Sequence, residues 1–381
     1  MSNLYSSAEK IGELLARELE QNPHFYFFSP DETTSNKFSA VFESESRAWN
    51  LPTLPWDLPE SPNGRIVELL SENVLFSVMT GHLMNNEPAM FGSYEAFYPI
   101  ITSQLLQQIK FIKQSDRTSW RPKYPAVNLL STSTCWRQDH NGFTHQSPAL
   151  ISTLLAHPSD LSNCFFPTDD LSAETIFNFM LTSKNVVNFT TFNKIPLPRY
   201  LNFASARQQF QDSGVYLHPE PQNLHPDIIF VSVGDLQTSE CEKARAILTE
   251  DLPFVQIRHL SLSALSYRAI GPIHDKLAKS EFNHFFTETC PIIANFHGYP
   301  ETFETILENY TSRSRLRVHG YSEEGSTTTP FEMLRRNAAS RFDLAIDVAK
   351  LANRPDLVKK YQNILAANHA YAVANGEDML E

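Results

Sequence analysis

The chain has 381 residues, of which 41% are hydrophobic and 19% charged, a composition typical of a folded globular protein and not of a disordered one. Its formal net charge of −12 argues against non-specific binding to nucleic acid, because neutralising phosphates requires a basic surface. The chain starts without a signal peptide and has no long apolar run, so we expect a cytoplasmic protein that does not cross a membrane.

The four cysteines lie far apart and form no Cys-x-x-Cys pair, so we expect reduced thiols and no zinc site. They are Cys135, Cys164, Cys241 and Cys290.

The first half of the chain predicts an α/β domain. A helical pattern at residues 4–19 precedes a proline-rich stretch at residues 52–62, which we interpret as a surface loop. Residues 66–79 predict a second helix, apolar on much of its circumference and therefore largely buried. Residues 126–130 and 186–191 predict buried strands with helices between them. This alternation favours a mainly parallel sheet covered by helices.

A second, smaller α/β unit is predicted after a proline-containing linker near residues 214–226. We therefore expect an α/β protein of two parallel-sheet-dominated domains, residues 1–213 and residues 227–381. The predicted elements of the second domain are a strand at 228–233, a helix at 239–250, strands at 254–257 and 291–296, and a helical stretch from Pro330.

The densest polar cluster, called the polar loop below, is residues 136–146, which follow the strand at 126–130. It contains Gln138, His140, Asn141 and His145, which offer hydrogen-bond donors, acceptors and proton carriers. A loop at the end of a parallel strand is where α/β proteins bind ligands. The alternative is a hydrogen-bonded surface loop without a ligand.

Glu72 falls within the apolar helical pattern, where a carboxylate needs a partner or a raised pKa. The alternative is a glutamate on the one solvated edge of that helix. Asp31 or Thr33 could cap a helix, and residues 325–330 could be a loop that leads into a helix at Pro330. There is no glycine-rich phosphate-binding motif.

Four motifs together resemble the phosphoketolases. They are Ser71-Glu72-Asn73, Gly92-Ser93-Tyr94-Glu95-Ala96-Phe97, Trp136 to Gln146, and Gly320-Tyr321-Ser322-Glu323-Glu324-Gly325-Ser326-Thr327-Thr328-Thr329-Pro330. Phosphoketolases are thiamine-diphosphate enzymes, carbon–carbon (aldehyde) lyases of carbohydrate metabolism. They cleave xylulose 5-phosphate or fructose 6-phosphate with inorganic phosphate to acetyl phosphate and an aldose phosphate. The likeness covers the chain from about residue 25 onward and implies a pyrimidine-binding domain followed by a transketolase-like C-terminal domain.

The resemblance implies a cofactor site. Glu72 matches the glutamate that hydrogen-bonds the aminopyrimidine ring and favours its imino tautomer, which takes the proton from the thiazolium carbon. Tyr94 and Phe97 match an aromatic segment that lines the pyrimidine and the reaction centre.

The resemblance also implies residues that handle substrate. Gln138, Asn141 and His145 match a loop around the sugar phosphate and the attacking phosphate, and His140 belongs to the same loop. Ser35 and Lys194 match further phosphate-binding positions, where the point charge of a lysine suits a phosphoryl group. The resemblance thus implies that Glu72 and the four loop residues are catalytic. It also implies that Tyr94 contributes to the substrate site.

The chain also departs from the family. Phosphoketolases are roughly twice as long and carry an N-terminal domain that anchors the diphosphate through Mg²⁺, using a Gly-Asp-Gly segment; the closest match here is Gly234-Asp235-Leu236. The resemblance thus implies half of a phosphoketolase, active in a homo- or hetero-oligomer with a separate N-terminal half or with a full-length phosphoketolase. The segment between Glu72 and Tyr94 diverges from the family.

Two alternatives remain open. The chain could be a non-catalytic interaction protein that pairs with a phosphoketolase. It could also be a subunit of a split transketolase-like enzyme, since Thr144-His145-Gln146 suits that group as well. Phosphate dependence of cleavage separates the latter from a phosphoketolase.

Overall fold

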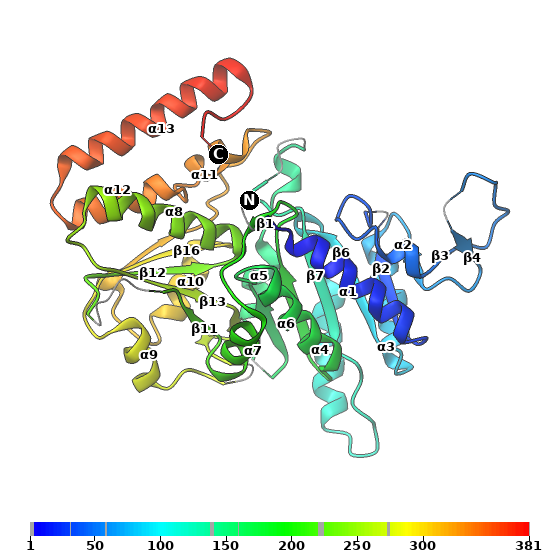
Figure 1. The fold of residues 1–381 in the computed structure, drawn as a ribbon. Helices are drawn as coiled ribbons and strands as arrows, with labels where there is room; N and C mark the ends of the chain where they lie inside the picture. The colour runs from blue at the N-terminus through cyan, green and yellow to red at the C-terminus, as the bar shows by residue number, and fades with distance from the viewer. Residues whose placement is uncertain are drawn as a thin grey trace.

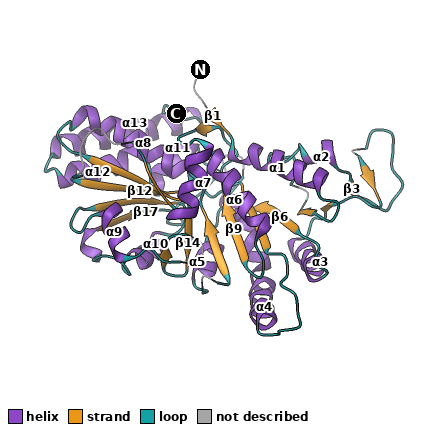
Figure 2. Ribbon diagram, turned by 60° about the horizontal axis from the view of Figure 1, so that its bottom comes forward, coloured by secondary structure: helices purple, strands orange, loops and turns teal. Residues whose placement is uncertain are grey.

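A computed structural model describes residues 4–30, 32–57, 59–137, 141–158, 160–219, 225–272 and 275–380. Two sheets dominated by parallel strands lie side by side, and each is covered by helices (Figures 1 and 2). The predicted α/β class is therefore confirmed. Within these ranges no helix is long and apolar enough to span a membrane.

The larger sheet is parallel from β8 to β4, and two antiparallel strands extend it at the β8 edge. Its order is β15 (Ala269–Ile270), β14 (Ala264–Ser266), β8 (Ser162–Phe165), β9 (Val187–Thr191), β7 (Val127–Thr132), β6 (Ala89–Tyr94), β2 (Tyr26–Ser29), β5 (Ile66–Glu68), β3 (Arg47–Ala48) and β4 (Glu60–Ser61). A separate short ribbon pairs β1 (Leu4–Tyr5) with β10 (Leu197–Pro198).

Helices cover both faces of the larger sheet, as parallel strands require. One face carries α1 (Ser7–Gln21), α6 (Asp170–Thr182) and α7 (Phe203–Asp212), which pack on one another. The other carries α3 (Glu72–Met84), α4 (Tyr98–Asp116) and α5 (Ala149–Leu155). The short helix α2 (Val41–Ser44) contacts α1.

The smaller sheet is parallel except for β11 at its edge. Its order is β11 (Val215–Leu217), β13 (Ile257–Leu262), β12 (Ile228–Val233), β16 (Ile292–Phe296) and β17 (Leu316–His319). Helices α8 (Asp235–Asp251), α12 (Arg341–Leu351) and α13 (Pro355–Asn375) lie on one side and α9 (Lys279–Phe286) and α10 (Pro300–Leu307) on the other (Figure 2). Helix α11 (Pro330–Arg336) packs on α13.

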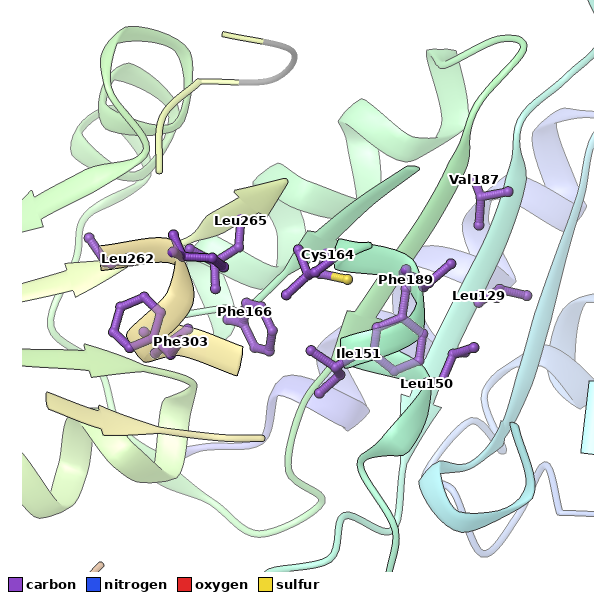
Figure 3. Close-up of a cluster of buried hydrophobic side chains, with 14 of the residues drawn as sticks. Leu129, Leu150, Ile151, Cys164, Phe166, Val187, Phe189, Leu262, Leu265 and Phe303 are labelled. Atoms are coloured by element: carbon purple, nitrogen blue, oxygen red, sulfur yellow. The ribbon is translucent and has the colours of Figure 1, made fainter. Parts of the chain in front are cut away.

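The two sheets share a hydrophobic core. The strands β14 and β15 follow β13 of the smaller sheet in sequence, yet β14 pairs with β8 of the larger sheet. Side chains from both sides meet there, including Cys164, Phe166, Leu262 and Phe303 (Figure 3). The C-terminal part of the chain is thus packed firmly against the larger sheet. The boundary at residues 213 and 227 stays a prediction.

The predicted helix at residues 66–79 is partly wrong. Residues 66–68 form β5, and the helix starts at Glu72 after the N-cap Ser71. One helix face is buried, but Val74 and Val78 on the other are 48% and 43% exposed. The sequence pattern showed an apolar circumference, and the residues that the structure describes leave part of it exposed.

Other boundaries shifted as well. The second-domain helix starts at Asp235 instead of residue 239, and the strand expected at 254–257 is β13, which starts at Ile257. Residues 33–37 form turns, so Thr33 caps no helix; its hydroxyl instead donates to Glu68. Asp31 lies outside the described residues. The strands at 228–233 and 291–296 and the helix from Pro330 are confirmed.

A buried tyrosine hydroxyl stabilises the centre of the larger sheet, and its removal should be measurable. The Tyr98 hydroxyl lies 3.1 Å from the carbonyl oxygen of Phe91 and 2.8 Å from that of Leu130, and its proton is shared between these two acceptors. We expect Tyr98→Phe to lower the free energy of unfolding by about 1–2 kcal/mol, measured by urea denaturation. Tyr371→Phe, which removes an exposed hydrogen bond to Glu377, is the control and should change it by less than about 0.5 kcal/mol. Equal effects would contradict this role.

Candidate functional site

The candidate residues gather at the carboxyl edge of the larger sheet. Strands β6, β7 and β9 are neighbours in parallel register, with Tyr94 opposite Thr132 and Ser131 opposite Thr191. Their carboxyl ends therefore lie at one edge, and the segments that follow them come together there. This is the place where α/β sheets bind ligands.

Tyr94 lies at the centre of this group. The Ser35 hydroxyl is 3.0 Å from the Tyr94 hydroxyl, and the Lys194 ammonium is 4.5 Å from the centre of the Tyr94 ring. Phe97 stacks parallel to Tyr94, with ring centres 5.8 Å apart and an angle of 7°. The structure therefore brings Ser35 and Lys194, which are far from Tyr94 in sequence, together with Tyr94 and its near neighbour Phe97. We call Tyr94 and Phe97 the aromatic pair.

His145 adjoins the aromatic pair. Its ring centre lies 5.3 Å from that of Phe97, edge to face, and its Nδ1 is 3.0 Å from the Thr144 hydroxyl. Asn141 is half-buried, and its carbonyl accepts a hydrogen bond of 3.1 Å from Thr327. The predicted site residues Gln138 and His140 lie outside the described residues.

Glu72 is the first residue of α3 and is half-buried, so it begins the helix instead of lying within it. A carboxylate at that position is favoured by the helix dipole. The charge of Glu72 helps to raise the pKa of the Glu32 carboxyl. Glu32 in turn accepts a hydrogen bond from Tyr94, so Glu72 acts electrostatically on a carboxyl of the group around Tyr94.

Glu32 is a site residue that the sequence did not reveal. Its Oε2 accepts hydrogen bonds from the backbone N–H of Tyr94 at 3.1 Å and from the Ser93 hydroxyl at 3.5 Å. Burial raises the pKa of this carboxyl to about 7, the charge of Glu72 adds to the rise, and the Tyr94 N–H and Lys194 oppose it. The only hint in the sequence was that Glu32 lies between Asp31 and Thr33, the two residues proposed above as possible helix caps.

Lys194 is affected by the same environment. Burial lowers the pKa of its ammonium to about 8, and the nearby charge of Lys37 adds to the effect, while Glu32 opposes it. Near neutral pH the site therefore holds a lysine that is mainly charged and a carboxyl, Glu32, that is about half ionised. Such a site can bind a phosphoryl group and can take up or release a proton.

The C-terminal part of the chain holds two of these segments in place. Asp235, the first residue of α8, accepts hydrogen bonds of 2.9 Å and 2.6 Å from the backbone and side-chain amides of Asn193, next to Lys194. The Gln146 side chain donates to the carbonyl of Ser326 at 3.0 Å and accepts from the Tyr321 hydroxyl at 3.1 Å. Residues 320–330, the fourth motif, thus support the polar loop.

Two family models together match nearly the whole chain. Residues 9–183 match the model described as D-xylulose 5-phosphate/D-fructose 6-phosphate phosphoketolase, and residues 194–381 match its C-terminal domain. The chain belongs to the phosphoketolase family. A probable phosphoketolase from Thermosynechococcus vestitus is 34% identical over 97% of this chain and 47% of its own length. The chain therefore spans about half the length of the curated relatives that it matches.

Transketolases are among the solved structures similar to this one. The transketolase from Leishmania mexicana has a TM-score of 0.68 and 13% identity, over 95% of this chain and 46% of its own. A structure described as a split gene transketolase, inactive beta4 tetramer, has a TM-score of 0.61 and 15% identity, over 91% of this chain and 97% of its own. At these identities the likeness shows the fold, which agrees with the predicted transketolase-like domains.

The raised pKa of Glu32 predicts a pH-dependent contribution to stability. The native carboxyl keeps its proton up to about pH 7, whereas an ordinary one releases it near 4.5. The stability that this proton confers is present below about pH 4.5 and is lost as the pH rises through 7, by about 2–3 kcal/mol. Glu32→Gln, which can still accept from Tyr94, removes this loss.

The test is urea denaturation from pH 4.5 to 8. Relative to the parent chain, the Glu32→Gln variant should gain stability across this window. Glu20→Gln, an exposed position in α1, is the control and should follow the parent chain throughout. Parallel curves for Glu32→Gln and the parent would show that Glu32 titrates as an ordinary carboxyl.

Proposed function

We propose that this chain forms the pyrimidine-binding and C-terminal domains of a thiamine-diphosphate-dependent phosphoketolase. The enzyme cleaves xylulose 5-phosphate or fructose 6-phosphate with inorganic phosphate to acetyl phosphate and an aldose phosphate. One observation carries the proposal: Ser35, Tyr94, Phe97, His145 and Lys194 converge at one edge of the sheet in a member of this family.

The donor set fits the cofactor ring. Glu72 offers a carboxylate for the ring nitrogen of an aminopyrimidine, and the aromatic pair offers a flat apolar surface beside it. When bound, thiamine diphosphate supplies the electron sink for carbon–carbon cleavage. The chain's part is to orient that ring through Glu72 and to exclude water with Tyr94 and Phe97.

We assign substrate binding to the residues around the aromatic pair. Lys194 and Ser35 flank the Tyr94 ring, and we assign them to a phosphoryl group, for which a charged ammonium and a hydroxyl are suitable donors. His145, beside Phe97, is placed to hold or move a proton at a substrate oxygen. From the sequence motif we also assign Asn141, Gln138 and His140 to this site.

The diphosphate and Mg²⁺ contacts come, in this proposal, from an N-terminal half on another polypeptide. The relatives are about twice as long, and the split-gene transketolase is matched over nearly its full length. Exposed apolar side chains at the start of α3 also support a partner. Val74 and Val78 on this helix are 48% and 43% exposed, and Leu70, which precedes the N-cap Ser71, is 79% exposed. An apolar face of this kind marks a protein interface. We expect the complex in the cytoplasm.

Reconstitution tests the proposal. The chain is co-purified with a phosphoketolase N-terminal half and supplied with thiamine diphosphate, Mg²⁺, sugar phosphate and inorganic phosphate. We expect acetyl phosphate, and at least about 100-fold less of it per unit time with Glu72→Gln, because the ring nitrogen loses its carboxylate. Glu20→Gln is the control and should keep full activity.

Each other outcome has a definite meaning. A stable complex that makes no acetyl phosphate contradicts the proposal. Full activity of the Glu72→Gln complex would show instead that this chain is a non-catalytic partner. Cleavage that does not depend on inorganic phosphate would indicate a split transketolase-like enzyme.

A further inference from the structure

A buried pair of side chains links the aromatic pair to the smaller sheet. Glu95 follows Tyr94 directly in the 3₁₀ helix η1 (Glu95–Phe97) and is 2% exposed; His297 follows β16 and is 1% exposed. His297 Nε2 lies 2.7 Å from Glu95 Oε1, so the ring N–H donates to the carboxylate. Ionisable groups this deeply buried are stable only when they are paired.

The same pair contacts the segments after the other two strands of the site. The second carboxylate oxygen of Glu95 accepts the backbone N–H of Cys135 at 2.8 Å. The Thr191 hydroxyl, at the end of β9, lies 3.4 Å from Glu95 Oε1 and 3.3 Å from His297 Nε2. The Trp136 indole N–H donates to the carbonyl of His297 at 2.8 Å. The Glu95–His297 pair and its hydrogen bonds therefore join the segments that follow β6, β7 and β16 to the end of β9.

A metal ion is the alternative occupant, since Glu95, Cys135 and His297 each offer a ligand atom, all within 4.8 Å of one another. Two observations oppose it. The Glu95 and His297 atoms already bond each other directly. Burial also raises the pKa of the Cys135 thiol well above its usual value, and the charge of Glu95 raises it further, which disfavours the thiolate that a metal needs.

We propose that His297 is a positioning residue for the site. It fixes the Glu95 carboxylate. Glu95 in turn fixes the backbone of η1, which carries Phe97 and directly follows Tyr94, and the backbone of Cys135, which directly precedes the polar loop. The histidine itself reaches neither Ser35 nor Lys194; it acts through Glu95. The role of the smaller sheet in catalysis is thus to hold the aromatic pair at its distance from Lys194. The catalytic part of this inference rests on the proposed function.

The test compares His297→Leu with His297→Gln, whose amide can replace the Nε2 donor. Hydrogen exchange is measured on the folded chain in peptides that cover residues 94–98 and 133–137. We expect His297→Leu to exchange at least about tenfold faster there and His297→Gln to stay within about threefold of the parent chain, because a charge-assisted hydrogen bond is lost and then restored. In the reconstituted complex, kcat/KM should fall and recover in the same order.

The control is His259→Leu. His259 on β13 is equally buried, and its Nδ1 lies 2.5 Å from Oε1 of Glu242 on α8. This variant therefore removes a similar pair that does not contact Glu95. It should leave exchange at residues 94–98 and 133–137 unchanged. If His297→Leu does not fold, His297→Asn replaces it, because its amide is one bond too short to reach Glu95.

The two proposals fail separately. Exchange at residues 94–98 and 133–137 that is the same in the His297→Leu, His259→Leu and parent chains overturns the positioning role, whatever the activity. A reconstituted parent complex without activity contradicts the proposed function, while the exchange comparison still decides whether His297 orders η1.

Discussion

The parallel register of β6, β7 and β9 determines where the candidate residues lie. Because Tyr94 pairs with Thr132 and Ser131 with Thr191, three strands end at one edge, and the residues that follow them meet there. Phe97, His145 and Lys194 come from these three segments. A slip of one residue in any pair would turn its side chains to the opposite face of the sheet. The hydrophobic core that fixes the register is therefore a condition for the site.

Burial gives this edge its electrostatic character. Glu32 and Lys194 lie partly out of water, so the pKa of one rises to about 7 and that of the other falls to about 8. The two groups moderate each other's shifts, and Glu72 strengthens that of Glu32. The site can thus hold a cation for a phosphoryl group beside a carboxyl that gains or loses a proton near neutral pH. Isolated surface residues would not have both properties.

Much of the fold and of the candidate site could be predicted from the sequence, and the features that the sequence did not reveal have physical reasons. The strands at 228–233 and 291–296 are continuous apolar runs, and the family motifs pointed to the residues that meet around Tyr94. The sequence pattern misjudged α3, because periodicity reports apolar faces and not what covers them. It also missed Glu32, Glu95 and His297. Their roles depend on burial and on partners up to 202 residues away, which no local pattern contains.

The central claim is that this chain contributes the pyrimidine side of a shared thiamine-diphosphate site and that the diphosphate side comes from a partner. Calorimetric titration of thiamine diphosphate with Mg²⁺ tests it most directly, first into the chain alone and then into its complex with a phosphoketolase N-terminal half. The account predicts weak or undetectable binding to the chain alone and clear binding to the complex. Tight, Mg²⁺-dependent binding by the chain alone would contradict it.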